Sequence, residues 1–400
     1  MSTEYRSRPH GSASGGPRPL LRAVAVACAA VLAAFTIAAC GSSSGPSSAS
    51  GSSASGSSAG GQGVNKGAAQ QAIAPYTEQS SDFPVTEPLS KPLPAGTKFA
   101  YLQCGAQTCA VAGQVLNAAV KTVGGELTII NSGSTAATSQ AAASSVLALK
   151  PAALIVAGID PQQYGDSLRK ISDAGIKIVS ISVAVDTKPF GITANYLGAQ
   201  TFQLAGKLMA DWVVVKKGAG ANVAFFGVPE LTFSPIMEKA FKEELAAKCT
   251  SCTVRNVDVG IATLGTTAPR TVVTDLQSHP DTNMMVFSSG DLAAGVPAAM
   301  SAAGLSTTTL LWSPKPGSLQ DIKDGKIAAA LAQDFVVSVW VAVDVAARLI
   351  EGDQPTKSEQ AGEVPLQFLE QKNITFDPSR GWTAYADYAQ RFTQLWHPAG

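Results

Sequence analysis

The chain has 400 residues, only 14% of them charged, and its 29 lysines and arginines balance its 29 aspartates and glutamates. A chain of this length can form two domains. No basic stripe follows the N-terminal region, so the electrostatic footprint of a nucleic-acid-binding protein is missing and we expect no nucleic-acid partner.

Residues 1–39 predict an export signal, because Arg18 and Arg22 precede an apolar run that ends in small residues. The tetrapeptide IAAC at 37–40 resembles the bacterial lipoprotein box, in which the cysteine becomes an N-terminus that carries acyl chains such as palmitate. The alternative is a transmembrane anchor, but a span needs about 20 apolar residues and this run is shorter. We therefore expect lipid on Cys40, whereas Cys28 fits the box less well.

Residues 40–75 predict a flexible tether, because most of this stretch is serine, glycine and alanine and can bury no core. A proline-rich lead-in follows at 76–95. Together these segments are expected to hold a folded part of the chain away from a membrane.

From residue 98 onward, short apolar runs alternate with segments of helical periodicity. The first set predicts strands at 98–103, 126–131, 152–157 and 176–181, with helices at 110–123, 138–150 and 161–174. The second set predicts helices at 199–217, 234–248, 269–278, 292–303 and 336–351, and strands at 221–227, 253–259, 283–288, 309–312, 327–333 and 363–374. This alternation predicts an α/β fold with two similar parallel-sheet lobes.

Four cysteines remain after the lipoprotein box, in the local pairs Cys104 with Cys109 and Cys249 with Cys252. Three disulfide pairings are formally possible. A four-cysteine zinc site is the alternative, although an exported protein with an even number of cysteines more often forms disulfides. We expect no metal and no cofactor.

This layout resembles the type I periplasmic binding proteins, most closely the ribose- and sugar-binding branch. The resemblance covers about residues 96–375 and rests on chain order and on short matches at 102–105, 159–161, 193–195, 289–291 and 331–333. It implies two Rossmann-like lobes joined by a multi-strand hinge. The N-terminal lobe would comprise 96–193 and 334–367, and the C-terminal lobe 194–333 and 368–400, including an aromatic C-terminal helix.

The two-lobe fold also implies which cysteines pair. Cys104 and Cys109 fall in the N-terminal lobe, whereas Cys249 and Cys252 fall in the C-terminal lobe. Because bridged Cα atoms must lie within about 7 Å of each other, the implied pairs are 104–109 and 249–252.

Ligands of such folds bind beyond the carboxyl ends of the strands, in a cleft between the lobes. The candidate ligand-binding residues are those that follow strands: Gln103, Gln107, Asp160, Asn195, Phe233, Asp291, Trp312 and Gln333. The same loops also contain Ser182 and Lys315. Helix capping is the alternative role for Asp160, Asn195 and Asp291, and lobe core is the alternative for the aromatic residues. We place Asp291 and Trp312 outside the lobe core.

The loops depart from the sugar-binding branch where that branch carries arginines. The segments at 180–184 and 232–236 read SISVA and TFSPI instead. A guanidinium is the usual group for gripping carboxylates, phosphates or vicinal hydroxyls. We therefore expect a neutral or cationic ligand with hydroxyl or amide groups on an apolar frame.

The resemblance implies a monomeric, lipid-anchored, extracytoplasmic receptor that delivers its ligand to the permease of an ABC importer. A ligand-sensing module for a signalling partner is the alternative. An envelope enzyme fits less well, because only His279 and His397 remain beyond the signal for a catalytic triad. We expect the aromatic tail to pack on the C-terminal lobe, with partner binding as the alternative.

Overall fold

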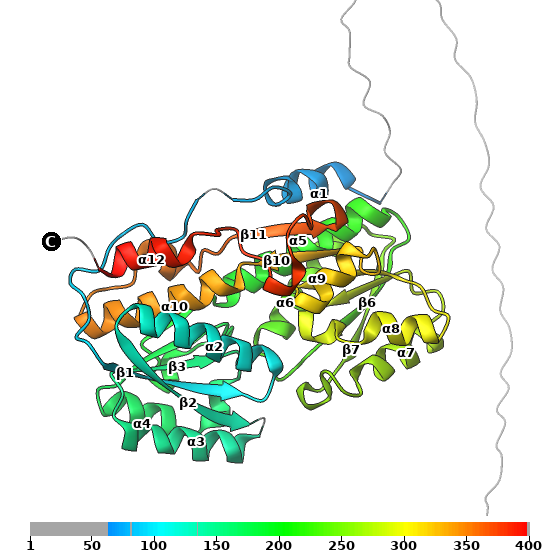
Figure 1. The fold of residues 1–400 in the computed structure, drawn as a ribbon. Helices are drawn as coiled ribbons and strands as arrows, with labels where there is room; N and C mark the ends of the chain where they lie inside the picture. The colour runs from blue at the N-terminus through cyan, green and yellow to red at the C-terminus, as the bar shows by residue number, and fades with distance from the viewer. Residues whose placement is uncertain (1–62, 81, 134, 398–400) are drawn as a thin grey trace, which may run out of the picture. The chain divides into compact units, whose positions relative to one another are not determined.

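The computed structural model describes residues 63–80, 82–133 and 135–397. The export signal, the predicted lipid site Cys40 and most of the tether lie outside the described residues. Within them the chain forms two α/β lobes, each built on a mostly parallel sheet, as the sequence predicts (Figure 1).

The N-terminal lobe contains a five-stranded parallel sheet in the order β2-β1-β3-β4-β5. The strands are β1 (Thr97–Cys104), β2 (Gly125–Gly133), β3 (Ala153–Ala157), β4 (Lys177–Ile181) and β5 (Ala194–Tyr196). The helices between them are α2 (Gln107–Thr122), α3 (Ala136–Leu149) and α4 (Ser167–Asp173). Strand β3 reads ALIVA and is buried almost throughout, as expected for a parallel strand covered by helices on both faces.

The C-terminal lobe contains a six-stranded sheet in the order β11-β10-β9-β8-β6-β7, in which only β11 is antiparallel to its neighbour. The strands are β6 (Asn222–Gly227), β7 (Thr253–Asp258), β8 (Met284–Phe287), β9 (Thr308–Trp312), β10 (Ala329–Gln333) and β11 (Leu366–Glu370). The helices are α5 (Ala199–Lys217), α6 (Phe233–Lys248), α7 (Ala268–Ser278), α8 (Val296–Ala302) and α9 (Pro316–Lys323). Short 3-10 turns complete the connections: η1 (Ala74–Tyr76), η2 (Pro161–Tyr164), η3 (Lys188–Phe190), η4 (Ile261–Thr263), η5 (Gly290–Ala293), η6 (Gln371–Asn373) and η7 (Pro378–Arg380).

Four segments after β1 cross between the lobes, and the last of them runs from β11 to the C-terminal helix described below. The first follows β5, the second lies between β10 and α10 (Phe335–Glu351), and the third runs through α11 (Lys357–Ala361) to β11. Helix α10 packs on β3, β4 and α2, so it belongs to the N-terminal lobe. The first boundary differs slightly from the prediction, because β5 pairs with β4 and the chain leaves the N-terminal sheet only after Tyr196.

Asp334 joins the second and third crossings. Its buried carboxylate accepts hydrogen bonds from the Val337 N–H (3.1 Å), the Ala384 N–H (2.8 Å) and the Thr383 hydroxyl (2.9 Å). Its own N–H donates to the Pro365 carbonyl at 3.1 Å in the third crossing. Burial raises the pKa of Asp334 to about 6, although these hydrogen bonds oppose the shift.

The prediction that the tether continues to residue 75 is wrong. Helix α1 (Lys66–Ile73) packs on α5 and α6 of the C-terminal lobe (Figure 1). The Asn65 side chain caps the helix by accepting from the Ala68 N–H at 3.1 Å. Ala69 and Ile73, four residues apart, are buried against the lobe. The overall composition of residues 40–75 does not indicate this short amphipathic helix.

The prediction that the aromatic tail packs on the C-terminal lobe is also wrong. Helix α12 (Tyr388–Trp396) packs on α10 of the N-terminal lobe (Figure 1). The indole rings of Trp396 and Trp340 stack at 5.3 Å with 6° between their planes. Because α10 is buried around its whole circumference from Val337 to Leu349, and the sheet can cover only one of its faces, another element must cover the rest. The tail provides this cover.

The proline-rich lead-in runs beside this tail. Val85, Leu89 and Leu93 of the lead-in are buried in the same core. The Leu89 N–H donates to the carbonyl of Leu395 at 2.9 Å. The lead-in and the C-terminal helix therefore complete the N-terminal lobe together.

Candidate functional site

A cavity lies between the lobes, at the carboxyl ends of strands from both sheets. Its volume is about 90 Å³. The N-terminal lobe contributes Tyr101, Ala106, Thr108, Cys109, Ala112, Leu116, Ala157, Gly158, Ile181 and Ser182, together with Phe335, Val339 and Ala342 of α10. The C-terminal lobe contributes Phe202, Leu231, Phe233, Ser289, Asp291, Trp312, Ser313, Lys315 and Gln333. This is where ligands of open α/β sheets bind.

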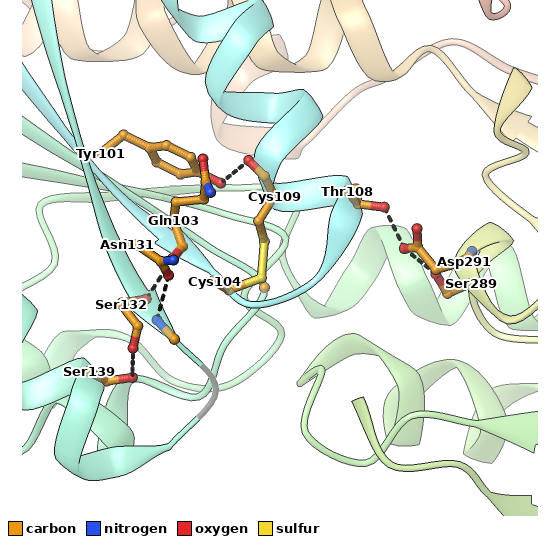
Figure 2. The surroundings of a disulfide bond; sticks show 12 residues. Tyr101, Gln103, Cys104, Thr108, Cys109, Asn131, Ser132, Ser139, Ser289 and Asp291 are labelled. Atoms are coloured by element: carbon orange, nitrogen blue, oxygen red, sulfur yellow. Dashed lines mark hydrogen bonds between the residues drawn. A yellow bond between two sulfur atoms is a disulfide. The ribbon is translucent and has the colours of Figure 1, made fainter. Parts of the chain in front are cut away.

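The lobes touch each other at this cavity. The Thr108 hydroxyl, at the start of α2, donates a hydrogen bond to the carboxylate of Asp291 in the opposite lobe (Figure 2). A second contact joins the loops after β3 and β6, where the Thr232 N–H donates to the Gly158 carbonyl at 3.1 Å. The described arrangement is therefore that of a cleft whose lobes have closed on each other.

A bond between the sulfur atoms of Cys104 and Cys109 closes the loop that carries Thr108 (Figure 2). Their Cα atoms lie 5.5 Å apart. The Tyr101 hydroxyl donates to the Cys109 carbonyl at 3.1 Å and fixes the same turn from the sheet side. The Cys249 and Cys252 sulfur atoms are also bonded, at the end of α6 and outside the cavity lining.

Two serines with left-handed backbone conformations line the cavity at equivalent places in the two lobes. Ser182 follows β4 with φ 59°, and Ser313 follows β9 with φ 51°. The N–H of each donates at 3.0 Å to a carbonyl on the neighbouring strand. A non-glycine residue rarely adopts this conformation, which costs about 1–3 kcal/mol and is found most often at functional sites.

Gly290 allows the two C-terminal loops of the cavity to meet. A Cβ atom at this position would collide with the Ser313 carbonyl oxygen. The loop after β8, which carries Asp291, can therefore lie directly against the loop after β9 only because residue 290 is glycine.

Three aromatic rings form one wall of the cavity. Phe202 of α5 stacks on Phe233 with ring centroids 4.7 Å apart, and its edge meets Trp312 at 6.0 Å. Trp312 is only 2% exposed and belongs to the buried core as well as to the wall. Its predicted place outside the lobe core is thus wrong, because β9 is an inner strand covered on both faces.

Two opposite charges face the cavity. The Asp291 carboxylate accepts from Thr108 and, at 3.2 Å, from the Ser289 hydroxyl. Lys315 is half-buried, and its Nζ lies 4.9 Å from the ring centroid of Phe335. Burial lowers the pKa of Lys315, and the Asp291 carboxylate opposes this shift. Among the described residues, no carboxylate oxygen lies within 4.0 Å of this ammonium group.

Four of the eight predicted ligand-binding residues line the cavity: Phe233, Asp291, Trp312 and Gln333. The Gln333 amide is engaged within the protein, where it donates to the Ser338 hydroxyl at 3.0 Å. Contact of these residues with a ligand remains a prediction.

The other four lie outside the cavity lining. Asp160 caps η2 by accepting from the Gln162 N–H at 2.9 Å. The Asn195 amide bridges its own lobe, accepting from Ser180 at 2.8 Å and donating to the Val183 carbonyl at 2.9 Å. Gln103 lies at the end of β1, and Gln107 is exposed at the start of α2.

Four further lining residues are not among those predicted from the sequence: Tyr101, Thr108, Phe202 and Phe335. Thr108 lies one residue beyond the predicted Gln107, and neighbouring residues of a helix point in different directions. Phe202 and Phe335 belong to the first turns of the two helices that follow hinge crossings. For both, an aromatic residue soon after a crossing between the lobes could have indicated a place in the cavity wall.

In the described part of the chain, no group of three or more histidine, cysteine, aspartate or glutamate residues is placed to hold a metal ion. None of the helices described there has the length and apolar character needed to cross a membrane.

A family model described as a periplasmic binding protein domain matches residues 105–354. A sugar ABC transporter subunit from Rhodobacter sphaeroides 2.4.1 has a similar structure, with 21% identity, a TM-score of 0.60, and coverage of 70% of this chain and 99% of that chain. A solute-binding protein from Agrobacterium vitis with bound allitol gives 20% identity, a TM-score of 0.61, and coverage of 70% and 97%. A periplasmic solute-binding protein from Actinobacillus succinogenes 130z with bound D-allose gives 19%, 0.60, and coverage of 69% and 98%. No curated protein sequence matches the chain.

Proposed function

We propose that this chain, which belongs to the periplasmic binding protein family, is a lipid-anchored receptor for a small neutral solute. It captures the solute between its lobes and delivers it to the permease of an ABC importer. The fold is that of sugar-binding ABC transporter proteins, which supports a role in binding rather than in catalysis.

The observation that carries the proposal is the cavity to which both lobes contribute walls. Two lobes joined by several crossing segments can rotate about those segments and close on a ligand. The Thr108 to Asp291 hydrogen bond then forms only when the lobes come together. A permease could distinguish the closed form from the open one, which is what delivery requires.

The membrane attachment rests on Cys40, which lies outside the described residues. A lipid there would place the lobes on the outer side of the membrane, where disulfides form and persist. We therefore propose that the 104–109 and 249–252 bonds exist in the mature protein. Peptide mapping without reducing agent should recover these two pairs and no peptide that joins one lobe to the other.

Binding is tested by measuring thermal unfolding in the presence of sugars, polyols, nucleosides, amino acids and aromatic compounds. A ligand at 100 times its Kd stabilises the folded state by about 2.7 kcal/mol. Trp312→Phe should weaken the best ligand about 2- to 10-fold by changing the aromatic wall. Arg270→Ala on the exposed part of α7 is the control and should leave affinity unchanged. A panel in which nothing raises the unfolding temperature would contradict solute binding.

Delivery is tested separately, by chemical crosslinking in intact cells followed by identification of the captured proteins. Recovery of an ABC permease subunit supports the proposal. Recovery of a membrane-bound signalling receptor in its place would contradict delivery and favour the sensing alternative.

A further inference from the structure

Most of the cavity surface is hydrocarbon. Phe202, Phe233 and Trp312 form an aromatic wall on the C-terminal side. Aliphatic side chains such as Leu116 and Val339 face them from the N-terminal lobe. A flat or cyclic apolar body placed between these walls would be buried on both faces, and burying apolar surface is the main source of affinity in such pockets.

Little of the cavity surface is polar, and two of its polar side chains already have partners within the protein. The Tyr101 hydroxyl donates to the Cys109 carbonyl, and the Gln333 amide donates to Ser338. A free monosaccharide carries hydroxyls around its whole ring, and each buried hydroxyl left without a partner costs about 5- to 150-fold in affinity. A molecule whose hydroxyls surround the entire ring is therefore a poor match for this cavity.

The two charged groups come from adjoining loops and so form one polar end. Asp291 follows β8 and Lys315 follows β9, and the two loops lie against each other where Gly290 approaches the Ser313 carbonyl. Thr108 and Ser289 both donate to the same oxygen of Asp291, which leaves the other carboxylate oxygen for a ligand. Lys315 contacts the Phe335 ring but has no carboxylate within 4.0 Å. This end thus offers one acceptor and one donor.

We propose that the ligand is a neutral molecule with an apolar ring body and a single polar end, which presents an acceptor to Lys315 and a donor to Asp291. An aromatic carboxamide has this chemistry, because its carbonyl oxygen and its N–H groups lie side by side. An anionic end would satisfy Lys315 but face the Asp291 carboxylate, and a cationic end would face Lys315. This inference rests on the proposed solute-binding function and specifies its ligand class.

The test is isothermal titration calorimetry of the full chain in matched detergent buffer, with three probes. Indole-3-carboxamide has the apolar ring and the neutral polar end, indole-3-carboxylate changes only that end, and D-glucose lacks the apolar body. The carboxamide should bind at least about 10-fold more tightly than either of the others.

Two variants test whether Lys315 and Asp291 bind the polar end of the ligand. Lys315→Met keeps the apolar stem and removes the ammonium group. Asp291→Asn keeps an oxygen for Thr108 and Ser289 and replaces the free oxygen by an amide that cannot accept a hydrogen bond. Each should weaken the carboxamide about 10- to 150-fold, as expected for loss of one charge-assisted hydrogen bond. Lys239→Met, at an exposed position of α6, is the matched control and should change nothing.

Each other outcome overturns a defined part of the inference. Tightest binding of D-glucose would refute the apolar body and leave the solute-receptor proposal standing. Tightest binding of the carboxylate, or unchanged affinity in Lys315→Met, would refute the neutral polar end. Absence of carboxamide binding at millimolar concentration would refute the ligand class alone, because the wider solute panel decides the proposed function independently.

Discussion

Replacing Trp396 tests whether the C-terminal helix is part of the N-terminal lobe. Its side chain is fully buried, it stacks on Trp340, and its indole N–H donates to the Asp344 carboxylate at 2.6 Å. Trp396→Phe keeps an aromatic ring but loses a hydrogen bond to a charged acceptor, which is worth about 1.5–3 kcal/mol. Trp396→Ala also loses the ring, so its cost should exceed that of Trp396→Phe and reach about 3–5 kcal/mol or more.

The assay is urea unfolding followed by circular dichroism, with the free energy of unfolding extrapolated to water. Trp382→Phe is the control, because that indole is half-buried and no hydrogen bond of its N–H is seen among the described residues. It should cost less than about 1 kcal/mol. A double-mutant cycle with Asp344→Asn should show coupling between residues 344 and 396. Equal stability of wild type and Trp396→Phe would refute the assigned packing.

Three further predictions concern the anchor, a cavity loop and the hinge. Cys40→Ser should release the protein from the membrane fraction or block its processing, whereas Cys28→Ser should leave localisation unchanged. Membrane attachment that survives Cys40→Ser would contradict the lipid site. Gly290→Ala should drive a methyl group into the Ser313 carbonyl and destabilise the fold by about 1–3 kcal/mol in the same urea assay. An unaltered midpoint of urea unfolding would show that the two loops can separate freely. Burial raises the pKa of Asp334 to about 6 from an ordinary value of 3.8. The protonated carboxyl group therefore stabilises the fold below pH 4, and up to about 3 kcal/mol of this stability is lost as the pH rises through 6. Asp334→Asn should reduce this loss when unfolding is compared at the two ends of that range, and an identical loss would assign the pH dependence to other groups.

The fold could be predicted from the sequence because its strands and helices are periodic and long. The helix expected at 199–217 has the same bounds in the structure. Strand β5 was missed because three residues carry no periodic signal. The partner of α12 was missed for a different reason: the pattern of a helix shows which of its faces is apolar, but not which distant surface that face covers.

The candidate site was predicted only to the level of loops. Position after a strand identifies the correct edge of a sheet, and Asp291 and Phe233 were found in this way. It does not determine whether a side chain turns into the cavity or back onto its own lobe, as Asn195 does. Phe202 and Phe335 line the cavity from the first turns of helices, so position after a strand does not identify them.

The pairing of the lead-in with the C-terminal helix affects the order in which the protein can be assembled during synthesis. Gln79 bonds to the Ala384 carbonyl across 305 residues of sequence, and Leu89 bonds to Leu395. The N-terminal lobe begins first on the ribosome, yet its α10 surface stays uncovered until the last helix has emerged. The export predicted from residues 1–39 would benefit from this delay, because the chain would remain loosely folded while it crosses a membrane. A chain that ends at Arg380 should therefore be digested by protease much faster than the whole protein, and equal resistance would show that the lobe is complete without its tail.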